Sequence, residues 1–140
     1  TNQDDDVLLM VGVDTEVYHG IVKCGAVGAI TGIGTIFPEE ALLQVALAKK
    51  AAEGNPEADV RARELENALS VIAKFDEGVD LVLYFKHLMV LKGHEEYRLN
   101  INETDALTPS QAKFCEVQFN QFNTWYANWI KQGGVIAECL

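Results

Sequence analysis

The side chains best suited to metal or thiol chemistry are few and scattered. The histidines have no cysteine or carboxylate partner at metal-ligand spacing; they are His19, His87 and His94. The cysteines are odd in number and contain no CxxC pair; they are Cys24, Cys115 and Cys139. This pattern matches neither a zinc site nor a disulfide framework, and it favours a reducing compartment. We therefore predict no metal site.

Three other motifs have both a chemical and a structural interpretation. Gly32-Ile33-Gly34 begins like a dinucleotide-binding loop, but Phe37 occupies the third glycine position and no acidic residue ends a following strand. Trp125 and Trp129 lie one helical turn apart, a spacing more typical of core or subunit contacts than of a ligand platform. A lysine in an apolar helix, such as Lys86, more often extends its amine to solvent or pairs it with another group than uses it in catalysis. We therefore predict no cofactor.

Composition narrows the class of protein further. The chain has 140 residues, of which 49% are hydrophobic, and this predicts one domain with an ample core. The formal net charge of −10 repels nucleic acid, and no apolar run is long enough to span a membrane. The acidic stretch at residues 1–6 is the opposite of a signal peptide. We predict a soluble cytoplasmic protein with no nucleic-acid or membrane partner.

The elements that must position any site begin with a β-α-β unit. Residues 7–13 form an apolar run without polar alternation, which is typical of a parallel strand buried on both faces. Asp14 or Thr15 can cap the helix predicted over residues 16–24. A second buried strand is predicted over residues 26–33, where two glycines allow something to approach the backbone closely.

The remainder of the sequence predicts helices. Their starts are marked by Pro38, by Asn55 before a proline, by Val79 and by the capping box of Thr108 with Gln111. The helix over residues 79–92 is largely apolar, so we expect it to be mostly buried.

This set of elements leaves the predicted sheet unfinished. Two strands buried on both faces would expose unpaired backbone N–H and C=O groups at their outer edges. The chain is therefore expected to be the end of a larger α/β domain or to complete its sheet with another chain, and we favour the first.

Two glycine-rich strand ends carry a family resemblance. Residues 7–14 read apolar–Gly–x–Asp, residues 25–35 read GAVGAITGIGT, and a helical lysine, Lys86, precedes Leu88 and Gly93. This order resembles the C-terminal part of the dihydrodipicolinate synthase/N-acetylneuraminate lyase family. The resemblance implies the last two strands of a (β/α)8 TIM barrel in residues 1–54 and a C-terminal helical extension in residues 55–140.

The sequence also departs from the family pattern. Thr35 stands in place of a usual Asn, and residues 98–100, Arg-Leu-Asn, lack the proline of Arg-x-Pro. Thr15 stands where sialic-acid lyases carry Glu, and Val13 where dihydrodipicolinate synthases often carry Asp. These departures favour a 2-oxo-3-deoxy sugar acid or related oxo acid as substrate, with dihydrodipicolinate-type condensation second.

The resemblance implies lyase or dehydratase chemistry in which a strand lysine forms a Schiff base with a 2-oxo acid such as pyruvate and a tyrosine relays protons. None of the eight lysines lies in a predicted strand, so we expect both catalytic residues upstream and this chain alone to be inactive. A homo-oligomer, dimer or tetramer, is also implied. A non-catalytic α/β interaction module remains the alternative.

The substrate-binding residues implied by the resemblance follow the two strands, since barrel sites lie at the carboxyl ends of strands. Asp14 would bind a substrate hydroxyl, or else cap a helix. The Ile30 backbone would hold the keto-acid end, with its side chain in the pocket wall. Thr31 would be a polar contact or simply a strand former. Gly12 and Gly32 would admit the substrate to the backbone, or else serve tight packing.

Overall fold

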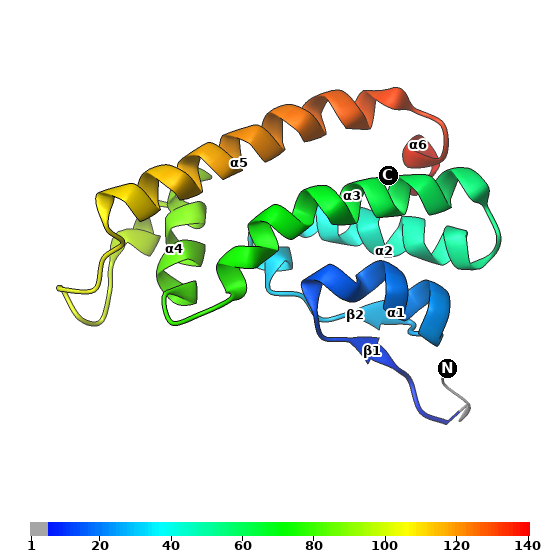
Figure 1. The fold of residues 1–140 in the computed structure, drawn as a ribbon, viewed down its shortest axis with the longest axis horizontal. Coiled ribbons are helices and arrows are strands. Elements are labelled where there is room, and N and C mark those ends of the chain that lie inside the picture. The colour runs from blue at the N-terminus through cyan, green and yellow to red at the C-terminus, as the bar shows by residue number, and fades with distance from the viewer. Residues whose placement is uncertain (1–5) are drawn as a thin grey trace.

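The computed structural model describes residues 6–140, so the acidic stretch interpreted above lies outside the described residues except for Asp6. It shows a mixed α/β fold with a small parallel sheet at one end and helices elsewhere (Figure 1). The strands and helices are β1 (Met10–Val11), α1 (Val17–Cys24), β2 (Gly28–Ala29), α2 (Pro38–Ala52), α3 (Pro56–Ala73), α4 (Leu81–Leu91), α5 (Pro109–Trp129) and α6 (Val135–Cys139). Short 3-10 turns are η1 (Asp14–Glu16), η2 (Ile33–Thr35), η3 (Lys74–Asp76), η4 (Glu95–Arg98) and η5 (Ile130–Gln132).

The predicted β-α-β unit is present. β1 and β2 are parallel, with Met10 opposite Gly28 and Val11 opposite Ala29. Helix α1 connects them and ends at Gly25, whose φ of 77° is the left-handed conformation that glycine adopts most easily. The strands are shorter than predicted, because only these pairs have regular ladder partners.

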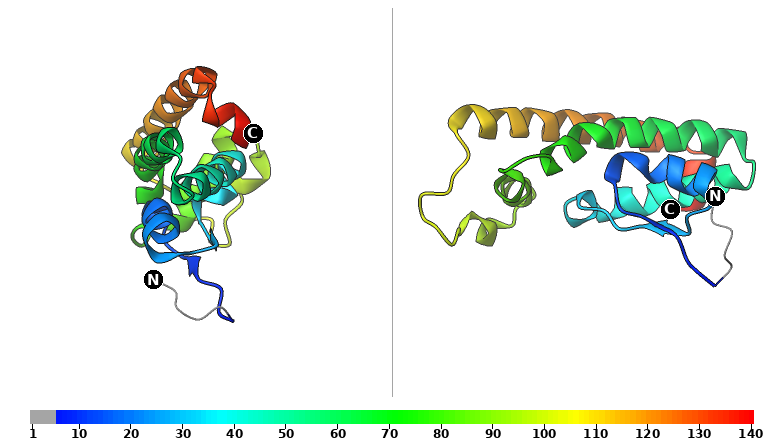
Figure 2. Two further views of the ribbon diagram at one scale, coloured as in Figure 1. Left: turned by 90° about the vertical axis from the view of Figure 1, so that its right-hand side faces the viewer. Right: turned by 60° about the horizontal axis from the view of Figure 1, so that its bottom comes forward.

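The prediction that both strands are buried on both faces is wrong for this chain. Val11 is buried beneath α1, where the helix backbone approaches so closely that a Cβ on Gly20 would lie 2.2 Å from a Val11 methyl. In contrast, Leu8 is 72% exposed and Ile30 is 71% exposed. The physical reason is that α1 and α2 pack on one face, whereas no described element covers the other (Figure 2).

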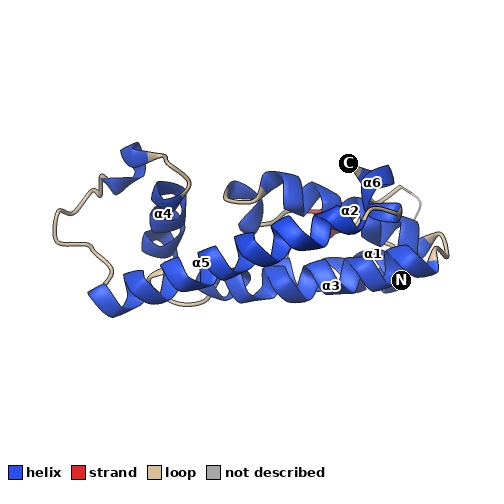
Figure 3. Ribbon diagram, turned by 90° about the horizontal axis from the view of Figure 1, so that it is seen from above, coloured by secondary structure: helices blue, strands red, loops and turns tan. Residues whose placement is uncertain are grey.

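The main core lies between the helices. α2 and α3 form a helical hairpin, and α5 runs alongside α3 (Figure 3). The side chains of this core come from the turn after β2 and from α2, α3, α4, α5 and α6. Those that are 0% exposed include Ile36, Leu47, Leu65, Leu88 and Ile136. The core thus continues across residue 54, and the division into residues 1–54 and 55–140 stays a prediction.

The helix starts are mostly as predicted. Asn55 Oδ1 accepts a hydrogen bond from the Ala58 N–H at 3.0 Å, and Thr108 forms a complete capping box with Gln111. The prediction that Asp14 or Thr15 caps α1 is wrong. Turn η1 intervenes, Glu16 is the N-cap residue, and no side chain hydrogen-bonds to that cap.

Helix α4 is less buried than predicted. Only Leu88 and Val90 of this helix are buried, whereas Val82 is 60% exposed. The helix stands across one end of α5, away from the α2–α3 hairpin, so few elements are available to cover it (Figure 1). Within the described residues, no helix is both long and apolar enough to cross a membrane.

Candidate functional site

The five predicted substrate-binding residues lie at one edge of the sheet. Gly12 follows β1 and Asp14 begins η1, while Ile30, Thr31 and Gly32 follow β2. Because the two strands are parallel, their carboxyl ends meet at the same edge.

Asp14 links the two strand ends. Its Oδ2 accepts a hydrogen bond from the Ile33 N–H at 3.0 Å. Its Oδ1 is buried and has no hydrogen-bond partner. Burial raises the pKa of this carboxyl, the charge of Asp76 adds to the rise, and the N–H groups of Ile33 and Gly32 oppose it. Asp14 thus ties η1 to the turn after β2 and keeps one buried carboxyl oxygen without a hydrogen-bond partner, and its role in substrate binding stays a prediction.

Thr31 and the two glycines have different local surroundings. Thr31 Oγ1 accepts a hydrogen bond from the Gly34 N–H at 3.1 Å, so this hydroxyl stabilises the turn into η2. A Cβ on Gly32 would lie 3.3 Å from Asp76 Oδ2, so glycine permits the close approach of η3. A Cβ on Gly12 would meet no atom within 4 Å, and tight packing within this chain therefore does not explain that glycine.

Ile30 has its backbone N–H engaged in the sheet, donating to the Val11 carbonyl at 2.7 Å. This differs from the expectation that its backbone holds the keto-acid end of a substrate, because a carbonyl oxygen alone cannot donate to a carboxylate. The Ile30 carbonyl remains able to accept a hydrogen bond from a hydroxyl. Its side chain is exposed and lines none of the described cavities, so its place in a pocket wall stays a prediction.

A cavity of about 310 Å³ lies next to this edge. Gly32, Thr35 and Asp76 line one side, and apolar side chains of α4 line the other, together with Lys86 and Tyr97. Sequence reasoning missed Asp76 and Tyr97. Asp76 follows the third helix and Tyr97 lies in an irregular segment, and neither stands in a motif that could have identified it.

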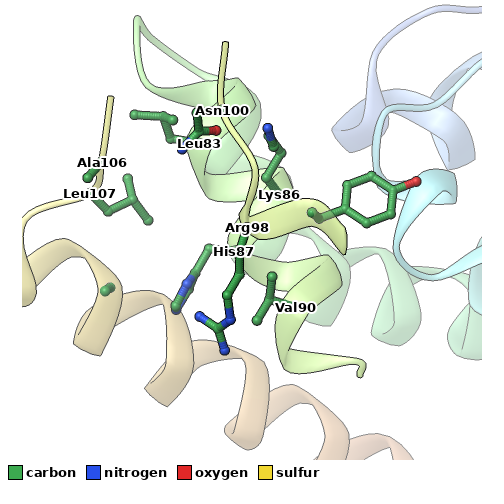
Figure 4. A pocket seen from close by; sticks show the side chains of 10 residues that line it. Leu83, Lys86, His87, Val90, Arg98, Asn100, Ala106 and Leu107 are labelled. Atoms are coloured by element: carbon green, nitrogen blue, oxygen red, sulfur yellow. The ribbon is translucent and has the colours of Figure 1, made fainter. Parts of the chain in front are cut away.

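A second cavity of about 300 Å³ lies between α4, η4 and the start of α5. Figure 4 shows His87 and Arg98 side by side in it, whereas Lys86 points away from both. Lys86 Nζ donates to the Leu99 carbonyl, and Arg98 forms an ion pair with Glu95. The pairing predicted for Lys86 is therefore confirmed, and the two cationic side chains already have partners.

No lysine lies in β1 or β2, as predicted. All eight lie on helices, in 3-10 turns or directly after a helix. Within residues 6–140, no group of three or more His, Cys, Asp or Glu side chains could hold a metal ion.

Comparisons with known proteins add no relative. No family model matches this sequence, and no curated protein is similar enough to count as a match.

Proposed function

We propose that this chain is the C-terminal part of a (β/α)8 barrel enzyme of the dihydrodipicolinate synthase/N-acetylneuraminate lyase type. The intact barrel would act as a lyase or dehydratase on a 2-oxo acid, through a Schiff base to a lysine outside this chain. The observation that carries the proposal is an unfinished parallel sheet with Asp14 at its carboxyl edge, where one buried oxygen of this carboxyl has no hydrogen-bond partner.

The open sheet supports a barrel because parallel sheets are normally covered on both faces. Here one face is covered by α1 and α2, while Leu8 and Val13, which flank β1, and Ile30, which follows β2, remain exposed. Additional barrel strands and the side chains inside the barrel would bury this apolar surface.

The carboxyl edge supports a hydroxylated substrate. Asp14 Oδ1 and the Ile30 carbonyl oxygen are both hydrogen-bond acceptors, and a Cβ on Gly12 would meet no atom within 4 Å. Acceptors at this edge suit hydroxyl groups, so a 2-oxo-3-deoxy sugar acid or a related oxo acid is the favoured substrate. Dihydrodipicolinate-type condensation is the second choice.

A non-catalytic interaction module is the competing proposal. The outer edges of β1 and β2, which have no ladder partner among the described residues, would favour it, because an exposed strand edge can pair with a strand of another chain. The two proposals differ in whether strands of the same protein or a strand of another chain complete the sheet. They also differ in whether a lysine amine of the native gene product can be trapped as a Schiff base.

Borohydride trapping with pyruvate distinguishes them. We expect no adduct on the 140-residue chain and one adduct per subunit on the native gene product, mapped by mass spectrometry to a lysine outside this chain. Trapping on Lys86 or Lys23 would contradict the assignment. A native product with no trapped lysine would favour the interaction module.

An Asp14→Asn variant of the native product tests the site itself. It keeps an amide oxygen for the Ile33 N–H but removes the charge, and we expect turnover of hydroxylated oxo acids to fall by about tenfold or more. Pyruvate trapping should change little, because it does not need the hydroxyl contact. The matched control is Thr15→Ala, and equal kinetics for both variants would leave Asp14 only its hydrogen bond to Ile33.

A further inference from the structure

Most of helix α5 lacks charged side chains. Residues 117–130 contain no charged side chain, although 23% of the whole chain is charged. The polar residues of this stretch are instead mostly amides. An amphipathic helix normally carries charged residues on its solvent face, so this composition requires a specific explanation.

A large cavity lies against this part of the chain. It has a volume of about 560 Å³ and lies between α3 and α5, which run side by side in Figure 3. Phe122, Trp125 and Trp129 form its aromatic wall. Four amide side chains also line it, and none of them hydrogen-bonds to another described residue; they are Asn67, Gln118, Gln121 and Gln132.

A second hollow of about 400 Å³ continues past Trp125 along α5. It shares Gln121 and Trp125 with the larger cavity, and its other lining residues are Asn120, Thr124 and Asn128. The Trp125 ring thus lines two neighbouring hollows. Uncharged polar groups line both of them, and the larger one is also lined by Arg61 and Glu64.

The aromatic wall is held in a fixed orientation. The Trp129 indole N–H donates to Glu64 Oε2 at 2.8 Å, and Arg61 Nη1 donates to the same oxygen at 2.7 Å. The Trp125 ring stacks on Trp129 with 5.2 Å between centroids and an angle of 22°. The charges of Arg61 and Glu64 are therefore already paired, and the Arg61 Nε is a buried donor without a partner.

This chemistry matches a neutral polyhydroxylated ligand. Amide groups both donate and accept, as sugar hydroxyls do, and the face of a fixed indole packs against the apolar C–H face of a sugar ring. A paired guanidinium and carboxylate offers no net charge to an ionic ligand. We propose that the groove between α3 and α5 binds a neutral saccharide of one or two rings, with Trp125 as the stacking platform.

This site is distinct from the carboxyl edge of the sheet and does not rest on the proposed enzymatic activity. A neutral sugar would carry no carboxylate for a Schiff-base lyase to recognise. The groove would then serve to hold the protein on a glycan or to sense a free sugar.

The test uses maltose and cellobiose with the 140-residue chain. Trp125 and Trp129 are the only tryptophans of the 140-residue chain, so their fluorescence reports directly on the groove. We expect a saturable fluorescence change with at least one sugar, and saturation-transfer NMR signals from its ring protons. Glycerol at the same concentration serves as the control and should give neither effect.

Three variants locate the binding. Trp125→Ala should weaken binding by at least about tenfold, as loss of a central aromatic contact does. Gln121→Ala should weaken it by about two- to fivefold, because it removes hydrogen bonds at the shared wall. Phe114→Ala is the matched control, since this ring is on α5 and exposed but lies outside both hollows; it should bind as the native protein does.

Two results would overturn the proposal. The first is no saturable binding of either sugar, or binding that Trp125→Ala leaves unchanged. The second is self-association in sedimentation experiments that Trp125→Ala abolishes, because the groove would then be covered by a second copy of the chain.

Discussion

The sheet end and the helical core of this protein treat apolar side chains in opposite ways. In the helical core, apolar residues of α2, α3 and α5 are buried against one another. At the sheet end, Val11 is buried but Leu8, Val13 and Ile30 face outward. Both regions contribute large apolar side chains, so the presence of such side chains alone does not decide whether they are buried.

The difference follows from how each type of element satisfies its backbone. A helix forms its hydrogen bonds within itself, so three helices can enclose a core without further chain. A strand needs neighbours on both sides, and two strands leave outer edges without ladder partners. The helical core is thus structurally complete within the described residues, whereas the sheet is not.

The largest expected effect lies in the helical core. Leu47 on α2 is 0% exposed, and we expect Leu47→Ala to lower the free energy of unfolding by about 2–5 kcal/mol through lost transfer energy and a cavity. Leu42 on the same helix is exposed, and Leu42→Ala should change it by less than about 0.5 kcal/mol. Urea unfolding measures both. Equal effects would contradict the core assignment of α2.

The second prediction compares two glutamates of α3 through pH. Burial raises the pKa of Glu66, which accepts from the Tyr18 N–H at 2.7 Å, and the charge of Glu16 adds to the rise. The hydrogen bond from Trp129 lowers the pKa of Glu64, and the Arg61 guanidinium also lowers it.

The signs of the two effects are opposite. The stabilising contribution of Glu66 is present at pH values below 4.5, the ordinary pKa of a glutamate. It is lost as pH rises through the pKa of Glu66 in the folded protein. That of Glu64 is present above 4.5 and is lost as pH falls through its folded pKa. Urea unfolding from pH 3 to 7 should show Glu66→Gln gaining on the native chain as pH rises, and Glu64→Gln falling behind it. Parallel pH profiles would refute this assignment.

The smallest expected effect is at the sheet edge. Ile30→Ser removes an exposed apolar side chain, so we expect a change of less than about 0.5 kcal/mol in the free energy of unfolding of the 140-residue chain. The same change in the native gene product should cost considerably more if further strands cover this face. A large cost in the 140-residue chain itself would mean that the exposed face is already covered there.

Parts of the candidate site were predictable and parts were not. The clustering of Gly12, Asp14 and Gly32 follows from two apolar runs joined by one helix, because such a unit is almost always parallel. The tie from Asp14 to Ile33 and the approach of Asp76 were not predictable, because they depend on how η1 and η3 pack against the turn after β2. Likewise, Tyr97 reaches the cavity only through the position of α4 and η4.

The sequence by itself determined the local features of this protein: the β-α-β order, the caps at Asn55 and Thr108, and the glycine that ends α1. These features depend on neighbouring residues and on backbone conformation, which adjacent positions set. Burial was decided only by the tertiary structure. The apolar runs of β1 and α4 were expected in the interior. Instead, one face of the sheet is open and most of α4 is only half-buried, because burial requires a covering element and the described residues cover these faces only in part.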